Sequence, residues 1–267
     1  MAACQACGMP RIADQALPLQ DWCVLSLRPR GQHAGLRAAA ARLGAGTLAL
    51  SPVAIAARNE PAARNALALA MHADIVLYTS PNAVAIAATL HRLEHTRRQT
   101  VLAVGSTTRR ALLRHGIDAA APRRMDSEGL LGMPELHHVA GRRIALITGA
   151  SGRDALAPAL RARGAEVSRI EVYARVPLPF SAQALARLRL VLAHPQRVVL
   201  ALSSGEALQH ALHAMPADLR EPLQRVMVVA ASARLAEAAR NDGFRHVAIA
   251  TDARPAALLR AAIDAFH

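Results

Sequence analysis

The 267-residue sequence contains no lysine: all 32 basic residues are arginine, against 19 acidic residues, which gives a formal net charge of +13. This charge favours an anionic partner. Aromatic residues make up only 2% of the chain, however, which leaves little to stack on nucleic-acid bases. We therefore expect no nucleic-acid partner. A small polyanionic substrate and a solvated basic surface both explain the charge.

Long apolar runs are also missing, although 53% of the residues are hydrophobic. No run approaches the roughly 18 residues that a membrane-spanning helix requires. The N-terminus lacks the basic segment and apolar stretch of a secretory signal. We expect a cytoplasmic protein with no membrane contact, in which residues 1–21 form a flexible tail.

Cysteine is scarce, with Cys4, Cys7 and Cys23 as the three in the chain. The CxxC pair has neither the second pair of a zinc ribbon nor the strand and helix that flank a redox site. Two histidine pairs at helical spacing lack a third ligand, namely His91/His95 and His210/His213. The GxSxG elbow of serine hydrolases and the dinucleotide glycine pattern are absent as well. We expect no metal and no cofactor.

Short apolar runs alternate with Ala/Leu/Arg-rich helical stretches from about residue 23 onward. Continuous apolar runs of this length are typical of parallel strands that helices cover on both faces. The expected strands are residues 23–27, 74–78, 100–104, 143–148, 197–202, 226–230 and 246–250. The expected helices are residues 35–43, 81–90, 107–115, 154–163, 205–214, 233–241 and 255–265. This alternation predicts an α/β fold with doubly wound parallel sheets.

The chain also repeats itself weakly. Equivalent positions are 120 residues apart at Gly44 and Gly164, and 127 residues apart at Gly116 and Gly243. A constant order with slowly growing spacing is what a duplicated unit with small loop insertions produces. We expect two similar α/β halves.

Small hydroxyl residues recur where an expected strand passes into a helix. Such junctions present free N–H groups and the positive end of the helix dipole, which favours anions at the carboxyl edge of the sheet. The alternative is that Ser and Thr simply cap the helices. The junctions are Thr79-Ser80, residues 105–107, Ser203-Ser204 and Ala231-Ser232. We read residues 149–153 as a short loop that carries an arginine, Arg153, able to reach an anion.

Seven motifs in a fixed order make the sequence resemble the uroporphyrinogen-III synthase family, over about residues 22–265. They are SLRP (26–29), YTSPNAV (78–84), VGSTT (104–108), SEGLL (127–131), GASGR (149–153), RGAEV (163–167) and VYAR (172–175). The resemblance implies two flavodoxin-like domains joined by a two-stranded linker, with the active site in the cleft between them. The first domain would be discontinuous, spanning residues 22–54 plus 176–267, and the second would span 55–175. The chain would cross between them near residues 52–56 and 172–177.

The resemblance also implies a reaction. The substrate would be hydroxymethylbilane, a linear tetrapyrrole with eight carboxylates. The enzyme would remove its terminal hydroxyl as water, invert the last pyrrole ring through a spiro intermediate and close the ring to uroporphyrinogen III, on the route to haem. No cofactor or metal is implied. The expected protein is a monomer that receives its substrate from the preceding bilane-forming enzyme.

Site residues follow from the same resemblance. Tyr173 matches the tyrosine of the family's YxR motif, and its phenol would assist departure of the hydroxyl as a general acid. The alternative for Tyr173 is a buried hinge residue. Contacts to the substrate would come from Arg28, Thr79, Ser80, Asn82, Gly105, Thr108, Arg153, Ser203 and Ser204.

The sequence departs from the family at Ser26, where many members have threonine, and at Leu235, which stands opposite Thr108 in the repeat. Other readings of the chain remain open. They are a non-catalytic paralogue that binds a tetrapyrrole or acts as a scaffold, a two-lobed sensor of a small anion, and a generic methyl- or glycosyltransferase. The sensor would require a DNA-binding helix-turn-helix or a signal peptide, and the transferase a glycine fingerprint.

Overall fold

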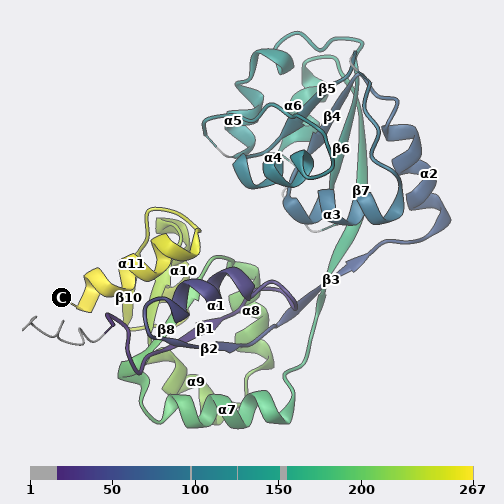
Figure 1. Ribbon diagram of the computed structural model, residues 1–267. Helices are drawn as coiled ribbons and strands as arrows, with labels where there is room; N and C mark the ends of the chain where they lie inside the picture. The colour runs from purple at the N-terminus through teal and green to yellow at the C-terminus, as the bar shows by residue number, and fades with distance from the viewer. Residues whose placement is uncertain (1–16, 97, 125, 151–154, 267) are drawn as a thin grey trace, which may run out of the picture. The chain divides into compact units, whose positions relative to one another are not determined.

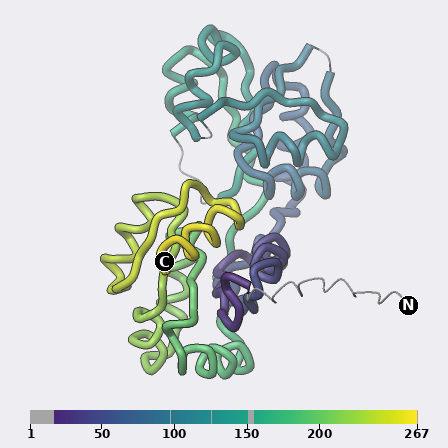
Figure 2. The backbone as a smooth tube through the Cα atoms, turned by 60° about the vertical axis from the view of Figure 1, so that its left-hand side comes forward, coloured from purple at the N-terminus to yellow at the C-terminus, as the bar shows by residue number. Residues whose placement is uncertain are grey.

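The structure, a computed structural model, describes residues 17–96, 98–124, 126–150 and 155–266. Its contacts divide the chain into two compact units. Unit 1 consists of Met1–Val53 and Pro177–His267, and unit 2 of Ala54–Val176. In Figure 2 the purple N-terminal segment and the green-to-yellow C-terminal part share unit 1, and the blue-to-teal middle forms unit 2. Unit 1 is therefore discontinuous in sequence.

The sheet of unit 1 has five parallel strands in the order β10-β9-β8-β1-β2. Numbered along the chain within this unit, the order is 2-1-3-4-5, the flavodoxin-like order. The strands are β1 (Cys23–Ser26), β2 (Gly46–Ala49), β8 (Val198–Leu202), β9 (Met227–Ala230) and β10 (His246–Ile249). The helices are α1 (Ala34–Ala41), α7 (Ala182–Leu192), α8 (Gly205–Ala214), α9 (Ala217–Gln224), α10 (Ala233–Asn241) and α11 (Pro255–Phe266).

Helices cover both faces of this sheet, as Figure 1 shows. Apolar residues of α7 to α10 pack with one set of strand side chains, including Leu25 and Leu200. Those of α1 and α11 pack with the alternate set, including Val24 and Val199. Because neighbouring strand residues point to opposite faces, every residue of β8 is buried. This explains why the strand reads as a continuous apolar run.

The sheet of unit 2 has the order β3-β7-β6-β4-β5. Its strands are β3 (Val53–Ala57), β4 (Ile75–Tyr78), β5 (Thr100–Ala103), β6 (Arg143–Gly149) and β7 (Glu166–Pro177). Its helices are α2 (Pro61–Ala70), α3 (Pro81–Leu90), α4 (Ser106–Leu113), α5 (Ser127–Leu131) and α6 (Leu156–Ala162). Residues of α2, α3 and α4 pack on one face of the sheet and residues of α5 and α6 on the other. Each unit is thus doubly wound.

Strand registers confirm the internal repeat. Cys23 pairs with Gly46 in unit 1, and Arg143 pairs with Glu166 in unit 2. Arg143 is 120 residues after Cys23, and Glu166 is 120 residues after Gly46. In unit 2, Leu102 of β5 also forms a parallel bridge with Ala120. This bridge takes the position that β10 takes beside β9 in unit 1. Four strands therefore correspond in order, β2-β1-β8-β9 to β7-β6-β4-β5.

The two segments that pass between the units also correspond. The Arg58 N–H donates to the Val172 carbonyl at 2.9 Å, and the Leu178 N–H donates to the Pro52 carbonyl at 2.8 Å. Each residue of the first bond is 120 positions from its counterpart in the second. β2 and β3 together are thus the equivalent of the single strand β7, which spans residues 166–177.

The structure corrects the expected tail. Residues 1–16, including Cys4 and Cys7, lie outside the described residues, but residues 17–21 form a packed turn. Leu19 is buried, and its N–H donates to the Leu43 carbonyl at 2.9 Å. Trp22 lies against Phe266, with ring centroids 4.1 Å apart. The packed chain therefore begins before Trp22, because an apolar side chain anchors the turn.

Several elements are absent from the expected strands and helices, namely β2, β3, β7, α2, α5, α7 and α9. β2 is a short edge strand that is only partly buried, and β7 mixes exposed polar residues with buried apolar ones. Neither forms a continuous apolar run. The apolar-run signal that identified the expected strands was therefore missing in β2 and β7.

Candidate active site

Tyr173 lies at the carboxyl edge of the unit 2 sheet with 4% of its surface exposed. Its phenolic oxygen is 3.2 Å from Ser80 Oγ. Ser80 is also the N-cap of α3, because its Oγ accepts a hydrogen bond from the Ala83 N–H at 3.0 Å. The Ser80 hydroxyl, between β4 and α3, therefore both caps a helix and contacts the phenol. Capping and site chemistry, the two readings of this junction, are compatible here.

Thr79 is tied to the neighbouring strand. Its Oγ1 lies 2.9 Å from Thr148 Oγ1 and 3.3 Å from the Ile147 carbonyl oxygen. The pairing of Tyr78 with Ile147 continues into this threonine pair, so the two hydroxyls sit side by side where β4 and β6 end. Asn82 lies half-buried in the first turn of α3. The register thus gathers small polar groups at one edge of the sheet.

Gly105 and Thr108 begin the next helix, α4. Gly105 is the N-cap and offers no side chain to the first turn. Thr108 is fully buried, and within the described ranges its Oγ1 has no hydrogen-bond partner. A buried hydroxyl without a partner is costly. The first turn of α4 thus carries an unsatisfied polar group close to a helix N-terminus, where anions are favoured.

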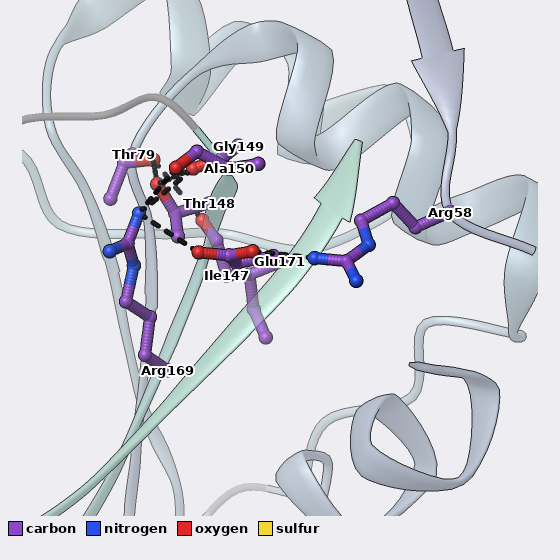
Figure 3. A network of polar contacts seen from close by, with 8 residues as sticks. All are labelled: Arg58, Thr79, Ile147, Thr148, Gly149, Ala150, Arg169 and Glu171. Carbon is purple, nitrogen blue, oxygen red and sulfur yellow. Dashed lines mark hydrogen bonds and ion pairs between the residues drawn. The ribbon is translucent and has the colours of Figure 1, made fainter. Parts of the chain in front are cut away.

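A charged network follows β7 on the same unit (Figure 3). The Arg169 guanidinium donates to the carbonyl oxygens of Gly149 at 3.0 Å and Ala150 at 3.4 Å. Glu171 lies between two guanidinium groups, 3.4 Å from that of Arg169 and 2.6 Å from that of Arg58. Arg169 and Glu171 are mostly buried, with 23% and 28% of their side chains exposed. The network therefore joins β7 to the end of β6 and to the chain before α2.

Arg28 is the basic group at the corresponding edge of unit 1. It is partly buried, burial lowers its pKa, and a guanidinium nitrogen donates to the Ala253 carbonyl oxygen at 3.2 Å. Ser26 pairs with Ala201, so Arg28 follows β1 beside the place where Ser203 follows β8. Ser204 caps α8 through a 3.2 Å hydrogen bond from the Ala207 N–H. A partly desolvated cation beside a capped helix start is suited to a carboxylate.

His33 holds the buried hydroxyl of Ser26 and the partly buried hydroxyl of Ser51 together in unit 1. Its Nδ1 is 2.8 Å from Ser26 Oγ, and its Nε2 is 2.8 Å from Ser51 Oγ. Burial lowers the pKa of His33, and the positive charges of Arg37 and Arg28 lower it further. The imidazole therefore bridges Ser26, the last residue of β1, and Ser51, which follows β2.

One histidine of each pair at helical spacing has its own separate hydrogen-bond partner. His95 Nε2 is 3.3 Å from the hydroxyl of Tyr78, whose pKa is raised by burial, and the ring nitrogen His213 Nδ1 is 2.7 Å from the Gln209 carbonyl oxygen. Among the described residues no three His, Cys, Asp or Glu side chains come together as a metal site would require. No helix in the same part of the chain is long and apolar enough to cross a membrane.

The sequence-predicted residues thus fall into two groups. Unit 2 brings together Tyr173, Thr79 and Ser80, and unit 1 brings Arg28 beside Ser203 and Ser204. Arg153 lies outside the described residues. Sequence reasoning missed Thr148, Arg169, Glu171, His33 and Ser51. Of these, Thr148 could have been found from the sequence, because it ends the expected strand 143–148 just as Thr79 follows the expected strand 74–78.

Comparisons with known proteins identify the family of this chain. The family model described as "Uroporphyrinogen-III synthase HemD" matches residues 35–260. The uroporphyrinogen-III synthase of Salmonella typhimurium is 36% identical over 218 residues, which cover 78% of this chain and 85% of that protein. That of Escherichia coli is 34% identical over 209 residues, covering 75% and 83%.

Solved structures give the same result. A mutant uroporphyrinogen III synthase from Thermus thermophilus matches with a TM-score of 0.62 and 26% identity, over 92% of this chain and 98% of that one. The Helicobacter pylori protein, at 13% identity, shares the fold with a TM-score of 0.59, over 91% and 98%. On the family model and the curated relatives, this chain belongs to the uroporphyrinogen-III synthase family.

Proposed function

We propose that the enzyme cyclises hydroxymethylbilane to uroporphyrinogen III with loss of one water and inversion of the terminal pyrrole ring. The observation that carries the proposal is family membership over most of the chain, with relatives of 34% to 36% identity. The bilane also closes without help, but to the symmetric type I isomer. The enzyme's main task is therefore to hold a folded geometry that favours the rearranged closure.

In this mechanism Tyr173 is the general acid. Departure of the hydroxyl as water needs a proton on its oxygen, and a phenol can supply it. The 3.2 Å contact with Ser80 supports the assignment, because it holds the phenol at the edge of the sheet where α/β folds bind ligands. The phenolate left behind would be stabilised by the Ser80 hydroxyl. It recovers a proton when the last pyrrole ring regains its aromatic form.

The remaining predicted residues would bind the eight carboxylates and the pyrroles. Arg28 and Arg153 would supply positive charge, and the helix starts at Ser80 and Ser204 would supply oriented dipoles. The formal net charge of +13 supports the assignment of a polyanionic substrate. Further contacts would come from Thr79, Asn82, Gly105, Thr108 and Ser203.

We place the enzyme in the cytoplasm, as a monomer that takes its substrate from the preceding bilane-forming enzyme. The supporting argument is chemical: bilane that stays free in water closes to the wrong isomer, so a short transfer between enzymes preserves the yield. Sedimentation of the purified protein, alone and mixed with the bilane-forming enzyme, tests both points.

The decisive experiment is the isomer ratio of uroporphyrin obtained from freshly generated hydroxymethylbilane, with and without the protein, after oxidation and chromatography. A shift from mostly type I to mostly type III is the expected result. Unchanged type I product from protein shown to be folded would overturn the proposal. Tight bilane binding without conversion would then identify a binding-only paralogue.

A further inference from the structure

We propose that Arg169 is a positioning residue for Tyr173, acting through the backbone of Gly149 and Ala150. The inference deepens the proposed function, on which it rests for the catalytic use of Tyr173. It assigns a role to charged residues that the sequence motifs did not include, namely Arg58, Arg169 and Glu171.

The direction of the Tyr173 side chain depends on an irregularity in the sheet. Between β6 and β7, Thr148 pairs with Glu171 and Gly149 pairs with Tyr173, so Val172 has no register partner on β6. Side chains alternate along a regular strand, yet Val172 and Tyr173 are both buried and belong to the same apolar cluster. A bulge re-aims side chains in this way. Tyr173 therefore reaches its site because the register shifts at the end of β6.

The end of β6 holds the tyrosine closely. The Ala150 N–H donates to the Tyr173 carbonyl oxygen at 2.8 Å. The phenol ring lies over Gly149, where an added Cβ would be 2.5 Å from Cζ. Any rotation of the Gly149 or Ala150 peptide would therefore move the ring or its backbone.

Arg169 fixes these same two peptides. Its guanidinium satisfies both carbonyls, at 3.0 and 3.4 Å, from the strand on which Tyr173 lies. Buried peptide carbonyls need partners, and a charged donor is among the strongest. Glu171, paired with Arg58 at 2.6 Å, keeps the guanidinium in place at 3.4 Å. Without Arg169 the carbonyls would turn to find water, and the bulge that aims Tyr173 would relax.

The test uses the fact that the chain has two tyrosines, Tyr173 and Tyr78. Ring-labelled tyrosine gives two resonances, which the variant Tyr78→Phe assigns. Spectra are recorded for Arg169→Met and Arg169→Lys, together with kcat, KM and the isomer ratio. Arg163→Met is the matched control, because Arg163 also donates to two carbonyls of this unit, those of Leu131 and Leu136, at 2.8 and 2.7 Å.

We expect Arg169→Met to shift the Tyr173 resonance and leave that of Tyr78 in place. Its kcat for type III product should fall by about tenfold to a hundredfold, as expected for a misplaced group, with KM within about twofold. Arg169→Lys should recover part of kcat and part of the wild-type position of the Tyr173 resonance, because an ammonium group can still donate to one carbonyl. Arg163→Met should leave the Tyr173 resonance and kcat unchanged. If Arg169→Met does not fold, Glu171→Gln should give the same changes at smaller size.

The proposal fails if Arg169→Met leaves the Tyr173 resonance and kcat at their wild-type values. It also fails if both tyrosine resonances shift together, as they would after general loosening of the unit. If the wild-type protein makes no type III product, the proposed function is wrong. The Tyr173 resonance still decides in that case whether Arg169 positions the ring.

Discussion

The ring of Tyr173 occupies the space that a side chain at position 149 would need, with Cζ 2.5 Å from the place of a Cβ on Gly149. The φ angle of Gly149 is not in the left-handed region, so glycine is required here by space alone. The two residues are partners across the register shift between β6 and β7. The position of the Tyr173 ring therefore depends on a glycine at position 149.

Gly149→Ala should displace the phenol and destabilise the fold. Overpacking of a buried site costs about 1–3 kcal/mol, and here the added methyl meets an aromatic ring. Urea unfolding measures the stability, and the isomer ratio measures the effect on the reaction. Gly132→Ala is the control, since its nearest neighbour would be 3.5 Å away, and it should stay within about 0.5 kcal/mol of wild type. Equal stability of the two variants would show that the ring can move at little cost.

Tyr173→Phe should keep the packing of the ring and remove the phenolic hydroxyl that donates the proton. We expect kcat for type III product to fall by about a hundredfold, the usual contribution of a general acid, with more type I isomer released. Tyr78→Phe removes the other phenol, which lies 3.3 Å from His95 Nε2, and should cost about 1 kcal/mol of stability with kcat preserved. Comparable kcat for Tyr173→Phe and wild type would restrict Tyr173 to the structural role of a hinge residue.

Arg28→Gln should weaken substrate binding more than turnover. Among the residues that the structure describes, no carboxylate pairs with Arg28, and burial already lowers its pKa. We expect KM to rise about tenfold, the equivalent of about 1.4 kcal/mol, with a smaller change in kcat. Arg30→Gln, at an exposed neighbouring position, should leave both constants near wild type. The same KM rise in both variants would indicate only long-range attraction by net charge.

His33 should make stability depend on pH. Its pKa is lowered from 6.5 in the folded protein, so the unfolded chain binds the proton more readily. The contribution of His33 to the free energy of unfolding is therefore fully present above about pH 6.5. It falls as the pH drops below that value, by at most about 1.4 kcal/mol per pH unit. Urea unfolding between about pH 7 and pH 5 should show a shallower slope for His33→Gln than for wild type. His95, whose pKa is also lowered by burial, would account for the slope that remains. Identical slopes would exclude His33 as a contributor.

The central strands and the strand-to-helix junctions were predictable because burial on both faces leaves an uninterrupted apolar run, as in β8. The repeat was predictable because its spacing survives in paired glycines: Gly44 and Gly164 both adopt φ near +80°, at +85° and +82°. The bulge at Val172 was not, because two consecutive buried residues in a strand of mixed exposure leave no periodic signal. The contact of His33 with Ser51 was not predictable either, because the two residues are 18 positions apart and meet only in the folded chain.

The correspondence of β2 and β3 with β7 has a consequence for the ancestry of the chain. Residues 23–121 carry one repeat and residues 143–249 the other, yet neither repeat builds a unit alone. Unit 1 takes β1 and β2 from the first repeat and β8 to β10 from the second, and unit 2 takes the complementary strands. This is the connectivity of a domain-swapped homodimer whose two protomers have been joined end to end. Cut between the repeats, each fragment would lack strands of both sheets, and only the two together could complete either one.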